Sequence, residues 1–586
     1  MNIVAPVYKL FIPLFTIFLI PLMLPAQTIK VVDAETEKPL VGVNVYNKNY
    51  SATGVTDSQG QLDITSFEKN EAIIFRYLGY VTDSLAYEEL KAKNFVVALQ
   101  SRSLSMEDLV VSANRWQQDA RKVPMSIATV TPEQVQFQNP QTAADLLESS
   151  GEVFVQKSQL GGGSPMLRGF ATNRVLLSVD GVRLNNAIFR SGNLQNVISL
   201  DANSIAQTEV IFGPGSVIYG SDAIGGVMSF KTLQPHFSTS SKARFTGDGM
   251  VRASSANEER TAHADINIGL QKWAFVSSVT VSDYDAQRMG SNGPDDFLRT
   301  ERVIRANGQD IVVDNESRKN QVPTGFSQLN AMQKFRFRPN KNWDLNLDLH
   351  YSTTGDIPRF DRLTERRNGQ FRKAEWFFGP QQWFMGNFHT TWFASNSLFD
   401  NLKTTIAFQD YEESRNDRNF GNPTFRNREE EVKIFSANFD FQKELSSRGT
   451  LYYGLEGVFN WVDSDAQVTN IETGESSPTQ TRYPDGSTWQ SYAGFVNYEH
   501  EFSPRLNVTA GARYNQYIID APFSDRFFDF PFDKAENSEG ALTGSLGSVF
   551  RPDESWKINA HISTGFRAPN IDDIGKVFDS EPGSVV

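Results

Sequence analysis

From about Lys242 onward, apolar and polar residues alternate along unusually long stretches of the chain. In 343–351, 506–514 and 556–562 every second position is apolar, and aromatic residues often stand near the ends. A period of two belongs to a β-strand with one apolar face, as in a transmembrane barrel that meets lipid outside and water inside. A soluble β-sandwich would alternate as well. Strand length, aromatic ends and the features described below favour the barrel, so we predict a mainly β chain with an antiparallel transmembrane β-barrel over 240–586.

The composition agrees with a barrel and excludes several other classes of protein. The chain has 586 residues, a mean hydropathy of −0.40 and a formal net charge of −13. After the first 25 residues no apolar run reaches the length of a membrane-spanning helix, so a bilayer protein of this composition would cross with strands. The absence of Cys excludes disulfides, thiolate metal sites and cysteine nucleophiles. An acidic chain is a poor binder of nucleic acid, and we expect no nucleic-acid partner.

The first 26 residues have the pattern of an export signal. Lys9 precedes an apolar run over 10–24, and a small residue follows. This order is typical of a secretory signal peptide. A single transmembrane anchor is the alternative, but Pro13 and Pro21 interrupt the run. We therefore predict a signal peptide over 1–26.

Two glycine-rich blocks, 167–197 and 204–232, stand out in the middle of the chain. In the first, apolar residues alternate up to Asp180-Gly181, a strong hairpin signal because both residues tolerate a positive φ. In the second, glycine at this density indicates tight turns or close approach of two backbones. The residues concerned are Gly213, Pro214, Gly220, Gly225 and Gly226. Neither a dinucleotide fingerprint nor a P-loop is present, so we predict structural glycines.

Together the two blocks resemble the plug domain of TonB-dependent outer-membrane receptors. The matching motifs are Arg168-Gly169-Phe170, Val179-Asp180-Gly181-Val182 and the run from Glu209 through Gly213-Pro214 and Gly220 to Gly225-Gly226. The order and spacing of the whole set carry the resemblance, which covers about 104–586. It implies an α+β plug over 115–235 inside the barrel. It also implies a latch between plug and barrel, for which Arg168, Gly169 and Glu209 are the candidates, although an ordinary structural pair remains open.

The resemblance further implies the form and location of the barrel. Barrels of this family have about twenty-two strands and usually close with a strand that ends in an aromatic residue. This chain ends on Gly-Ser-Val-Val. We therefore expect the C-terminal part of the barrel to be missing, through a truncated reading frame or a fragment. The expected location is the outer membrane, with its lipid around the barrel.

The segment 27–100 consists of short β-rich pieces separated by turn residues. This spacing predicts a β-sandwich. The segment resembles the carboxypeptidase-regulatory-like domain that precedes Bacteroidetes-type receptors of this class. It contains no set of zinc ligands, and we assign it no peptidase activity. We expect a periplasmic spacer or docking module.

The segment 104–114 lies between this domain and the plug. Its core reads Asp108-Leu109-Val110-Val111-Ser112-Ala113, which taken alone is a short edge strand or a linker. It resembles the TonB box of the family, which binds TonB by adding a strand to its sheet. That mode needs β-branched residues and a free backbone edge without proline. The resemblance implies TonB, with its inner-membrane energising complex, as the partner.

Long polar segments interrupt the barrel strands, and in this architecture long loops face outside. One of them is basic through Arg359, Arg362, Arg366 and Arg367. An iron chelate or haem would suit this loop as an anionic ligand, although a basic loop can also be only a solvated surface. Near the end, Phe566-Arg567-Ala568-Pro569 resembles a barrel motif of haem receptors that many other receptors of the family share.

No catalytic set emerges from the sequence. The six His residues show no spacing typical of a metal site, and we find no convergent acid, base or nucleophile. We expect no metal, no cofactor and no enzyme activity. The expected function is TonB-dependent active transport of a scarce ligand, haem or a ferric siderophore first, and cobalamin or an oligosaccharide next. An outer-membrane adhesin or structural barrel that is not energised through 104–114 is the alternative.

Overall fold

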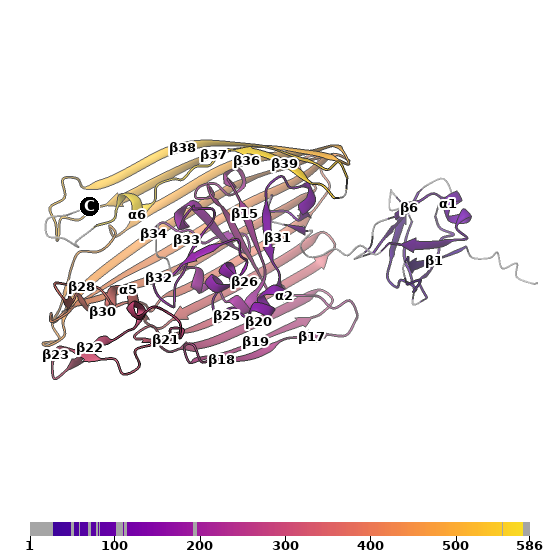
Figure 1. The fold of residues 1–586 in the computed structure, drawn as a ribbon. Helices are drawn as coiled ribbons and strands as arrows, with labels where there is room; N and C mark the ends of the chain where they lie inside the picture. The colour runs from indigo at the N-terminus through magenta and orange to yellow at the C-terminus, as the bar shows by residue number, and fades with distance from the viewer. Residues whose placement is uncertain are drawn as a thin grey trace, which may run out of the picture. The chain divides into compact units, whose positions relative to one another are not determined.

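A computed structural model describes residues 27–577 apart from 35, 48–51, 58, 68–71, 78–79, 81–82, 101–108, 111–113, 191–195 and 554. The chain divides into two compact units, Met1–Ser105 and Met106–Val586. Figure 1 draws the elements of both units along the chain. No helix among the described residues is long and apolar enough to span a membrane.

The first unit is a small β domain made of two sheets. One has the order β4-β1-β7, with β4 Gln61–Asp63, β1 Thr28–Asp33 and β7 Val96–Leu99. The other has the order β3-β2-β5-β6, with β3 Thr53–Val55, β2 Asn44–Asn47, β5 Ile73–Arg76 and β6 Asp83–Leu85. A short helix, α1 (Tyr87–Ala92), precedes β7. Ile29, Val31, Ile73, Phe75 and Val97 are fully buried in the core. The predicted N-terminal β domain is confirmed.

The plug opens the second unit and has its own mixed sheet, in the order β10-β15-β16-β13-β14. These strands are β10 Ile127–Val130, β15 Ile205–Phe212, β16 Gly226–Thr232, β13 Val175–Val179 and β14 Val182–Arg183, and a separate pair is β11 Phe154–Gln156 with β12 Ser164–Met166. β13 runs parallel to β16, and every residue of β13 is buried. The helices are α2 (Pro132–Gln138), α3 (Ala143–Ser149) and α4 (Ser216–Tyr219). Thr131 and Thr142 cap the first two by accepting a hydrogen bond from a main-chain N–H of the first turn.

One large sheet of 17 elements forms the barrel wall. Neighbouring long strands pair antiparallel, mostly in unbroken register. In order, the elements are β17 Arg244–Thr246, β18 Gly249–Ser254, β19 Glu259–Gly269, β20 Trp273–Tyr284, β25 Phe326–Asn340, β26 Trp343–Thr354, β27 Ile357–Pro358, β30 Lys373–Phe378, β31 Gln382–Phe393, β32 Asn401–Asn419, β33 Thr424–Ser446, β34 Gly449–Asn470, β35 Ser476–Pro478, β36 Ser487–Ser503, β37 Leu506–Pro522, β38 Lys534–Phe550 and β39 Ile558–Ser563. Among the described residues, no pairing joins β39 to β17 or β18.

The alternation read from the sequence separates the two faces of this wall. In β26, Leu347 and Tyr351 are 38% and 37% exposed on the outer face, whereas Asp348 and His350 are buried on the inner face. Aromatic residues gather where the strands meet short turns, and the rings of Trp343 on β26 and Trp392 on β31 stack with centroids 5.2 Å apart. Apolar outside, polar inside and aromatic at the ends is the arrangement of a lipid-facing barrel. The predicted mainly β barrel with an internal plug is confirmed.

The long connections between barrel strands all leave from one end. They are 285–325, 355–381, 471–486 and 523–533. They carry β21 Gln287–Arg288 with β24 Asn320–Gln321, β22 Glu301–Ala306 with β23 Gln309–Asp314, the helix α5 Phe360–Leu363, and β28 Arg366–Arg367 with β29 Gln370–Phe371. Figure 1 shows these elements gathered at the left end of the barrel, together with α6 (Ile571–Ile574), and short turns at the other end. The loop end is therefore distinct from the turn end.

Candidate functional site

The predicted coupling segment is partly described. Leu109–Val110 forms β8, which pairs antiparallel with β9 (Gln118–Asp119), so that Val110 lies opposite Gln118. Asp108, Val111, Ser112 and Ala113 lie outside the described residues. One backbone edge of the segment is thus held by the protein's own chain. Its role as a TonB box stays a prediction.

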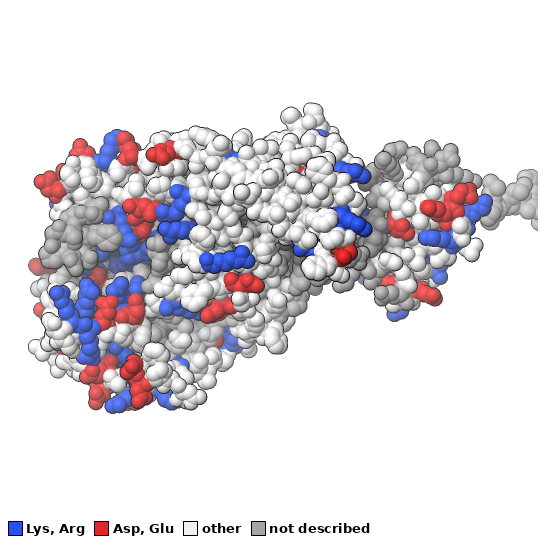
Figure 2. All heavy atoms as spheres, turned by 45° about the horizontal axis from the view of Figure 1, so that its top comes forward, with Lys and Arg blue, Asp and Glu red and all other residues white. Residues whose placement is uncertain are grey.

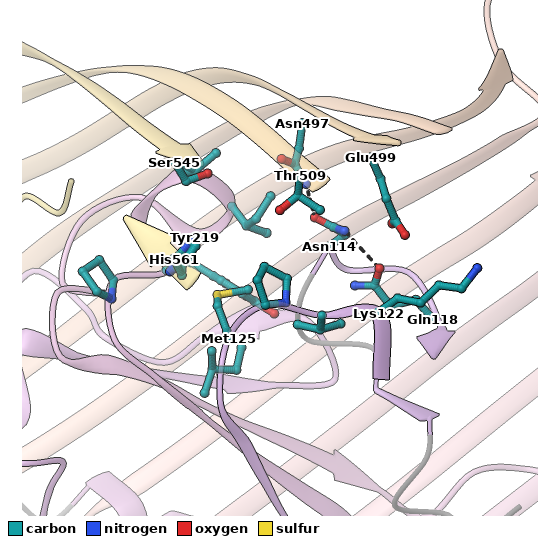
Figure 3. Close-up of a pocket in the computed structure, with 17 residues that line it drawn as sticks. Asn114, Gln118, Lys122, Met125, Tyr219, Asn497, Glu499, Thr509, Ser545 and His561 are labelled. Carbon is teal, nitrogen blue, oxygen red and sulfur yellow. Dashed lines mark hydrogen bonds between the residues drawn. The ribbon is translucent and has the colours of Figure 1, made fainter. Parts of the chain in front are cut away.

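Hydrogen bonds hold the stretch 114–125, which follows this segment, to the barrel wall. Asn497 Nδ2 donates to Asn114 Oδ1 over 2.6 Å, a contact drawn in Figure 3. Lys122 Nζ lies 2.6 Å from Glu501 Oε2, and Asn507 Nδ2 donates to the Lys122 carbonyl oxygen over 3.0 Å. The three wall residues come from β36 and β37. These contacts hold the stretch to the wall at Asn114 and at Lys122.

A cavity of about 40 Å³ adjoins this stretch (Figure 3). Its described lining comes from 114–125, from the loop and helix over 214–219, and from β36 to β39. Pro214 of the glycine-rich block lines it, and so does His561 of β39, which the alternation predicts to face inward. The cavity thus lies where 114–125, the plug and the barrel wall meet.

Arg115 connects this stretch to the plug core as well as to the wall. Its guanidinium is buried, with Nη2 2.5 Å from Glu456 Oε2 and Nη1 3.5 Å from Asp440 Oδ1. The same Nη2 donates to the carbonyl oxygen of Ile218 in α4 over 2.9 Å. Arg513 on β37 shares two of these partners, since it lies 2.7 Å from Glu456 Oε1 and 3.3 Å from the Ile218 oxygen. Burial alone would lower the pKa of Arg115, but the carboxylates of Asp440 and Glu456 raise it above its ordinary value.

We call the buried ion pairs that join the plug side to the barrel wall fastenings, and Arg115 forms the first of them. A second fastening lies at the Asp180-Gly181 turn. The turn joins β13 to β14 with φ of 47° and 86°, as the sequence predicts. Asp180 Oδ2 accepts from Thr232 Oγ1 over 2.7 Å and from Lys334 Nζ of β25 over 2.9 Å, and it lies 3.4 Å from His350 Nε2. Burial would raise the pKa of Asp180, but Lys334 and His350 hold it well below its ordinary value. A turn of the plug is thereby ionically bound to the wall.

A third fastening joins the first glycine-rich block to β32. Arg190 is 5% exposed, and its Nη1 lies 2.8 and 3.2 Å from the two carboxylate oxygens of Glu413. Tyr411 donates to Glu413 Oε2 over 3.1 Å. Burial opposes the charged form of Arg190, but Glu413 raises its pKa above the ordinary value. The sequence analysis did not identify Arg115 or Arg190 as wall contacts. Their position was the available signal, because Arg115 directly follows the segment 104–114 and Arg190 lies within the first glycine-rich block.

The residues predicted for the latch make contacts inside the plug. Arg168 is exposed with φ of 47°, and its guanidinium lies 4.5 Å from the centre of the Phe212 ring. Gly169 follows with φ of 86°. Glu209 is fully buried and forms an ion pair with Lys231 on the neighbouring strand β16. The contacts of Arg168 with Phe212 and of Glu209 with Lys231 both lie within the plug, and the part of these residues in a latch stays a prediction.

Close packing explains the glycines of the second block. Gly213 and Gly220 have φ of 87° and 77°, which favour glycine. A Cβ on Gly220 would lie 2.8 Å from the Nη2 of Arg513. A Cβ on Gly225 would lie 2.3 Å from Phe170 Cβ, and one on Gly226 would lie 2.2 Å from a main-chain oxygen. These positions bring backbones together and place the plug against the wall.

The motif 566–569 also lies against the plug. Arg567 Nε donates to the Asn173 carbonyl oxygen over 3.1 Å, and the main-chain N–H of Ala568 donates to Ser221 Oγ over 2.8 Å. Phe566 packs on a hydrophobic cluster that plug and wall share, and the Pro569 carbonyl accepts from a Trp indole of β36 over 3.0 Å, a contact within the barrel. In this chain the motif joins barrel to plug.

The basic loop is largely neutralised by carboxylates, two from the loop itself and one from the β22–β23 hairpin. Ion pairs join Arg359 to Asp361 at 2.6 Å, Arg362 to Glu365 at 2.5 Å and Arg366 to Glu301 at 2.5 Å, and Arg367 is exposed. Figure 2 shows blue and red side chains interleaved at the loop end, with a mostly white surface along the middle of the barrel. Ligand contact through these arginines stays a prediction.

In the part of the chain that the structure describes, two groups of side chains are close enough to share a metal ion: Asp180, Asp348 and His350, and Asp410, Glu412 and Glu431. In the first, Asp180 already accepts from Lys334 and Thr232. In the second, Lys433 pairs with Glu431 at 2.7 Å. Cations already engage one member of each group, and we assign a metal to neither.

Three family models match the chain. They are "TonB-dependent Receptor Plug Domain" over 119–227, "TonB dependent receptor-like, beta-barrel" over 317–584 and "CarboxypepD_reg-like domain" over 30–111. The matches follow one another along the chain in the order of the β domain, the plug and the barrel wall.

Curated relatives share shorter segments. A vitamin B12 transporter BtuB of Vibrio vulnificus (strain YJ016) is 41% identical over 130 residues, 22% of this chain and 21% of the relative. A hemin receptor of Yersinia pestis is 29% identical over 134 residues, 23% of this chain and 19% of the relative. The chain thus matches about a fifth of the length of these relatives.

Solved structures share the fold at low identity. The copper transporter OprC superposes with a TM-score of 0.58 at 11% identity, over 73% of this chain and 60% of that chain. The ferric yersiniabactin uptake receptor FyuA of Yersinia pestis gives 0.55 at 13% identity, over 76% and 65%. At these identities the likeness shows the fold alone.

Proposed function

The chain belongs to the TonB-dependent receptors, which are proteins of the outer membrane, and we propose that it imports a scarce ligand with energy delivered by TonB. One observation carries the proposal. The coupling segment 109–113 runs directly into a stretch that is bound to the barrel wall and, through Arg115, to the plug core. A pull on that segment is therefore transmitted to the plug.

Haem or a ferric siderophore is the first candidate for the ligand. Support comes from the hemin receptor of Yersinia pestis, which is 29% identical over its aligned segment. Cobalamin is the second candidate, because a vitamin B12 transporter is 41% identical over its aligned segment. No covalent chemistry is needed in either case.

Uptake would proceed by exchange of one strand partner for another. Ligand binds at the loop end and at the plug surface beneath it. TonB adds a strand to 109–113 and replaces β9 as the backbone partner of Leu109 and Val110. Force on that strand then acts on Asn114, Arg115 and Lys122, which hold the following stretch to the wall.

Growth of the native host tests the proposal. The complete gene is compared as wild type, deletion and Val110→Pro, on haem, on several ferric siderophores and with cobalamin limiting. Proline at 110 removes a backbone donor, so strand addition fails while the barrel stays intact. We expect the Val110→Pro strain to fail like the deletion on one nutrient, which names the ligand.

Gln118→Pro is the matched control, because it disturbs the same β8–β9 pairing from β9, the strand that TonB would replace, and leaves the backbone of 109–113 unchanged. A strain with Gln118→Pro should still grow. Growth of Val110→Pro like wild type, where the deletion fails, would refute coupling through this segment and support a passive or adhesive barrel.

A further inference from the structure

A cavity of about 150 Å³ lies among the outer loops, between the strand β22, the helix α5 and the strand β30. Three cationic residues line it, Arg299, Arg302 and Lys373. The other described lining residues are apolar, and no carboxylate is among them. Apolar walls strengthen the field of the cations, because little solvent screens it.

Arg299 is the buried member of this set. It is 7% exposed, and its guanidinium donates to the carbonyl oxygens of Val322 over 3.3 Å and Leu363 over 3.1 Å. The rings of Phe360 and Phe371 flank it at 5.5 and 5.3 Å. Within the described part of the chain, no carboxylate lies at ion-pair distance from Arg299. Its burial, together with the like charge of Arg366, lowers its pKa to about 10.

The cations that line the cavity differ in their nearest carboxylates. Glu301 lies two residues along the chain, but it is paired with Arg366 at 2.5 Å. Lys373 is paired with Asp417. Arg302 is exposed at the cavity, and the described residues offer it no carboxylate at ion-pair distance either. Two guanidinium groups therefore face the cavity with no carboxylate of the described residues at ion-pair distance, and a buried charge without a close partner is costly.

We propose that this cavity binds an anionic group, of the carboxylate or phosphate class, that the transported ligand carries. Guanidinium groups suit such anions because their planar fork matches two oxygens at once. The assignment to the ligand rests on the proposed function, whereas anion binding itself does not. Under this proposal Arg299 and Arg302 contact the anion, in place of the ion-paired arginines 359, 362 and 366 that the sequence suggested.

Calorimetry on the complete purified receptor tests the site, with citrate and inorganic phosphate as separate probes. We expect wild type to bind at least one of them, more weakly as salt rises. Arg302→Gln should weaken binding about tenfold or more, because it removes a charge-assisted hydrogen bond. Arg299→Gln should abolish it, and Arg299→Lys should restore part of it, since the charge returns without the fork.

Arg305→Gln is the matched control. Arg305 lies on the same strand as Arg302, but it is paired with Asp310 at 3.4 Å and Glu472 at 3.2 Å. Because Arg302 is exposed, its variant keeps the test informative even if Arg299→Gln disturbs the loops. Absence of binding to both probes in wild type, or equal binding by Arg302→Gln and Arg305→Gln, would overturn the proposal.

A second experiment, with lipid vesicles, distinguishes a lipid phosphate from an anionic group on the transported ligand. Receptor freed of lipopolysaccharide is mixed with vesicles that contain lipid A, in the absence of free anions. Binding to these vesicles that needs Arg302, without binding to citrate or phosphate, would make this a lipid site and overturn the ligand assignment. Conversely, a receptor that binds the soluble anions but supports growth on no nutrient would refute the proposed transport and leave the anion site standing.

Discussion

Replacing Arg115 by methionine should loosen the stretch that joins the coupling segment to the plug. The change keeps a long apolar side chain and removes the guanidinium, whose Nη2 lies 2.5 Å from Glu456 and 2.9 Å from the Ile218 oxygen. Its Nη1 lies 3.5 Å from Asp440. Removing one partner of a buried ion pair costs about 3–5 kcal/mol. Glu456 keeps Arg513 at 2.7 Å, so we expect the lower end, about 3 kcal/mol.

Hydrogen exchange of the amides in 114–125 measures this loss in the purified receptor. About 3 kcal/mol corresponds to local opening about a hundred times more populated, since about 1.4 kcal/mol is a factor of ten. Arg121→Met is the control, because the described ion pair of Arg121 is with Asp119 in the same stretch, at 2.7 Å, and its side chain is 43% exposed. Unchanged exchange in Arg115→Met, or an equal rise in the control, would refute the argument.

Two further predictions concern the plug. Asp180→Asn should weaken plug retention by about 3 kcal/mol, because it leaves the ammonium of Lys334 buried with a poorer partner. In wild type the pKa of Asp180 is depressed, so the contribution of Asp180 to plug retention should be constant above about pH 4 and lost as the pH falls through the folded-state pKa. Protection of the plug from protease, measured across pH in wild type and Asp180→Asn, checks the loss in the variant and the pH dependence. Gly220→Ala should destabilise the plug more than Gly181→Ala in thermal unfolding, because both positions have positive φ but only at 220 does a Cβ meet a barrel guanidinium, at 2.8 Å; equal effects would contradict this.

Local chemistry made much of the fold predictable. The Asp180-Gly181 hairpin follows from two residues that tolerate positive φ, and the structure has it at that place. The two faces of the barrel wall follow from a period of two, because a strand cannot present an apolar side chain at Leu347 without turning Asp348 the other way. These features depend on neighbours in sequence and need no knowledge of distant partners.

The fastenings could not be read in the same way. Arg115 and Glu456 are separated by 341 positions, Arg190 and Glu413 by 223. Their pairing depends on how the plug is rotated inside the wall, which no local pattern encodes. Counting arginines in a loop fails for the same reason: Arg366 is neutralised by Glu301 on a different hairpin, at 2.5 Å.

The order of the fastenings along the chain determines how the plug should yield. Arg115 lies next to the coupling segment, and Asp180 and Arg190 come later. A pull from the N-terminal side therefore loads Arg115 first, while the two later ion pairs still hold the sheet of the plug to β25 and β32. Both later pairs are buried, as the Arg115 pair is, but they lie farther along the chain from the point of pulling, and their rupture costs more than release of the half-exposed ion pair of Lys122. Force at the coupling segment should accordingly free 114–125 before it disturbs the sheet, so the plug should open from its N-terminal edge and not leave the barrel as one body.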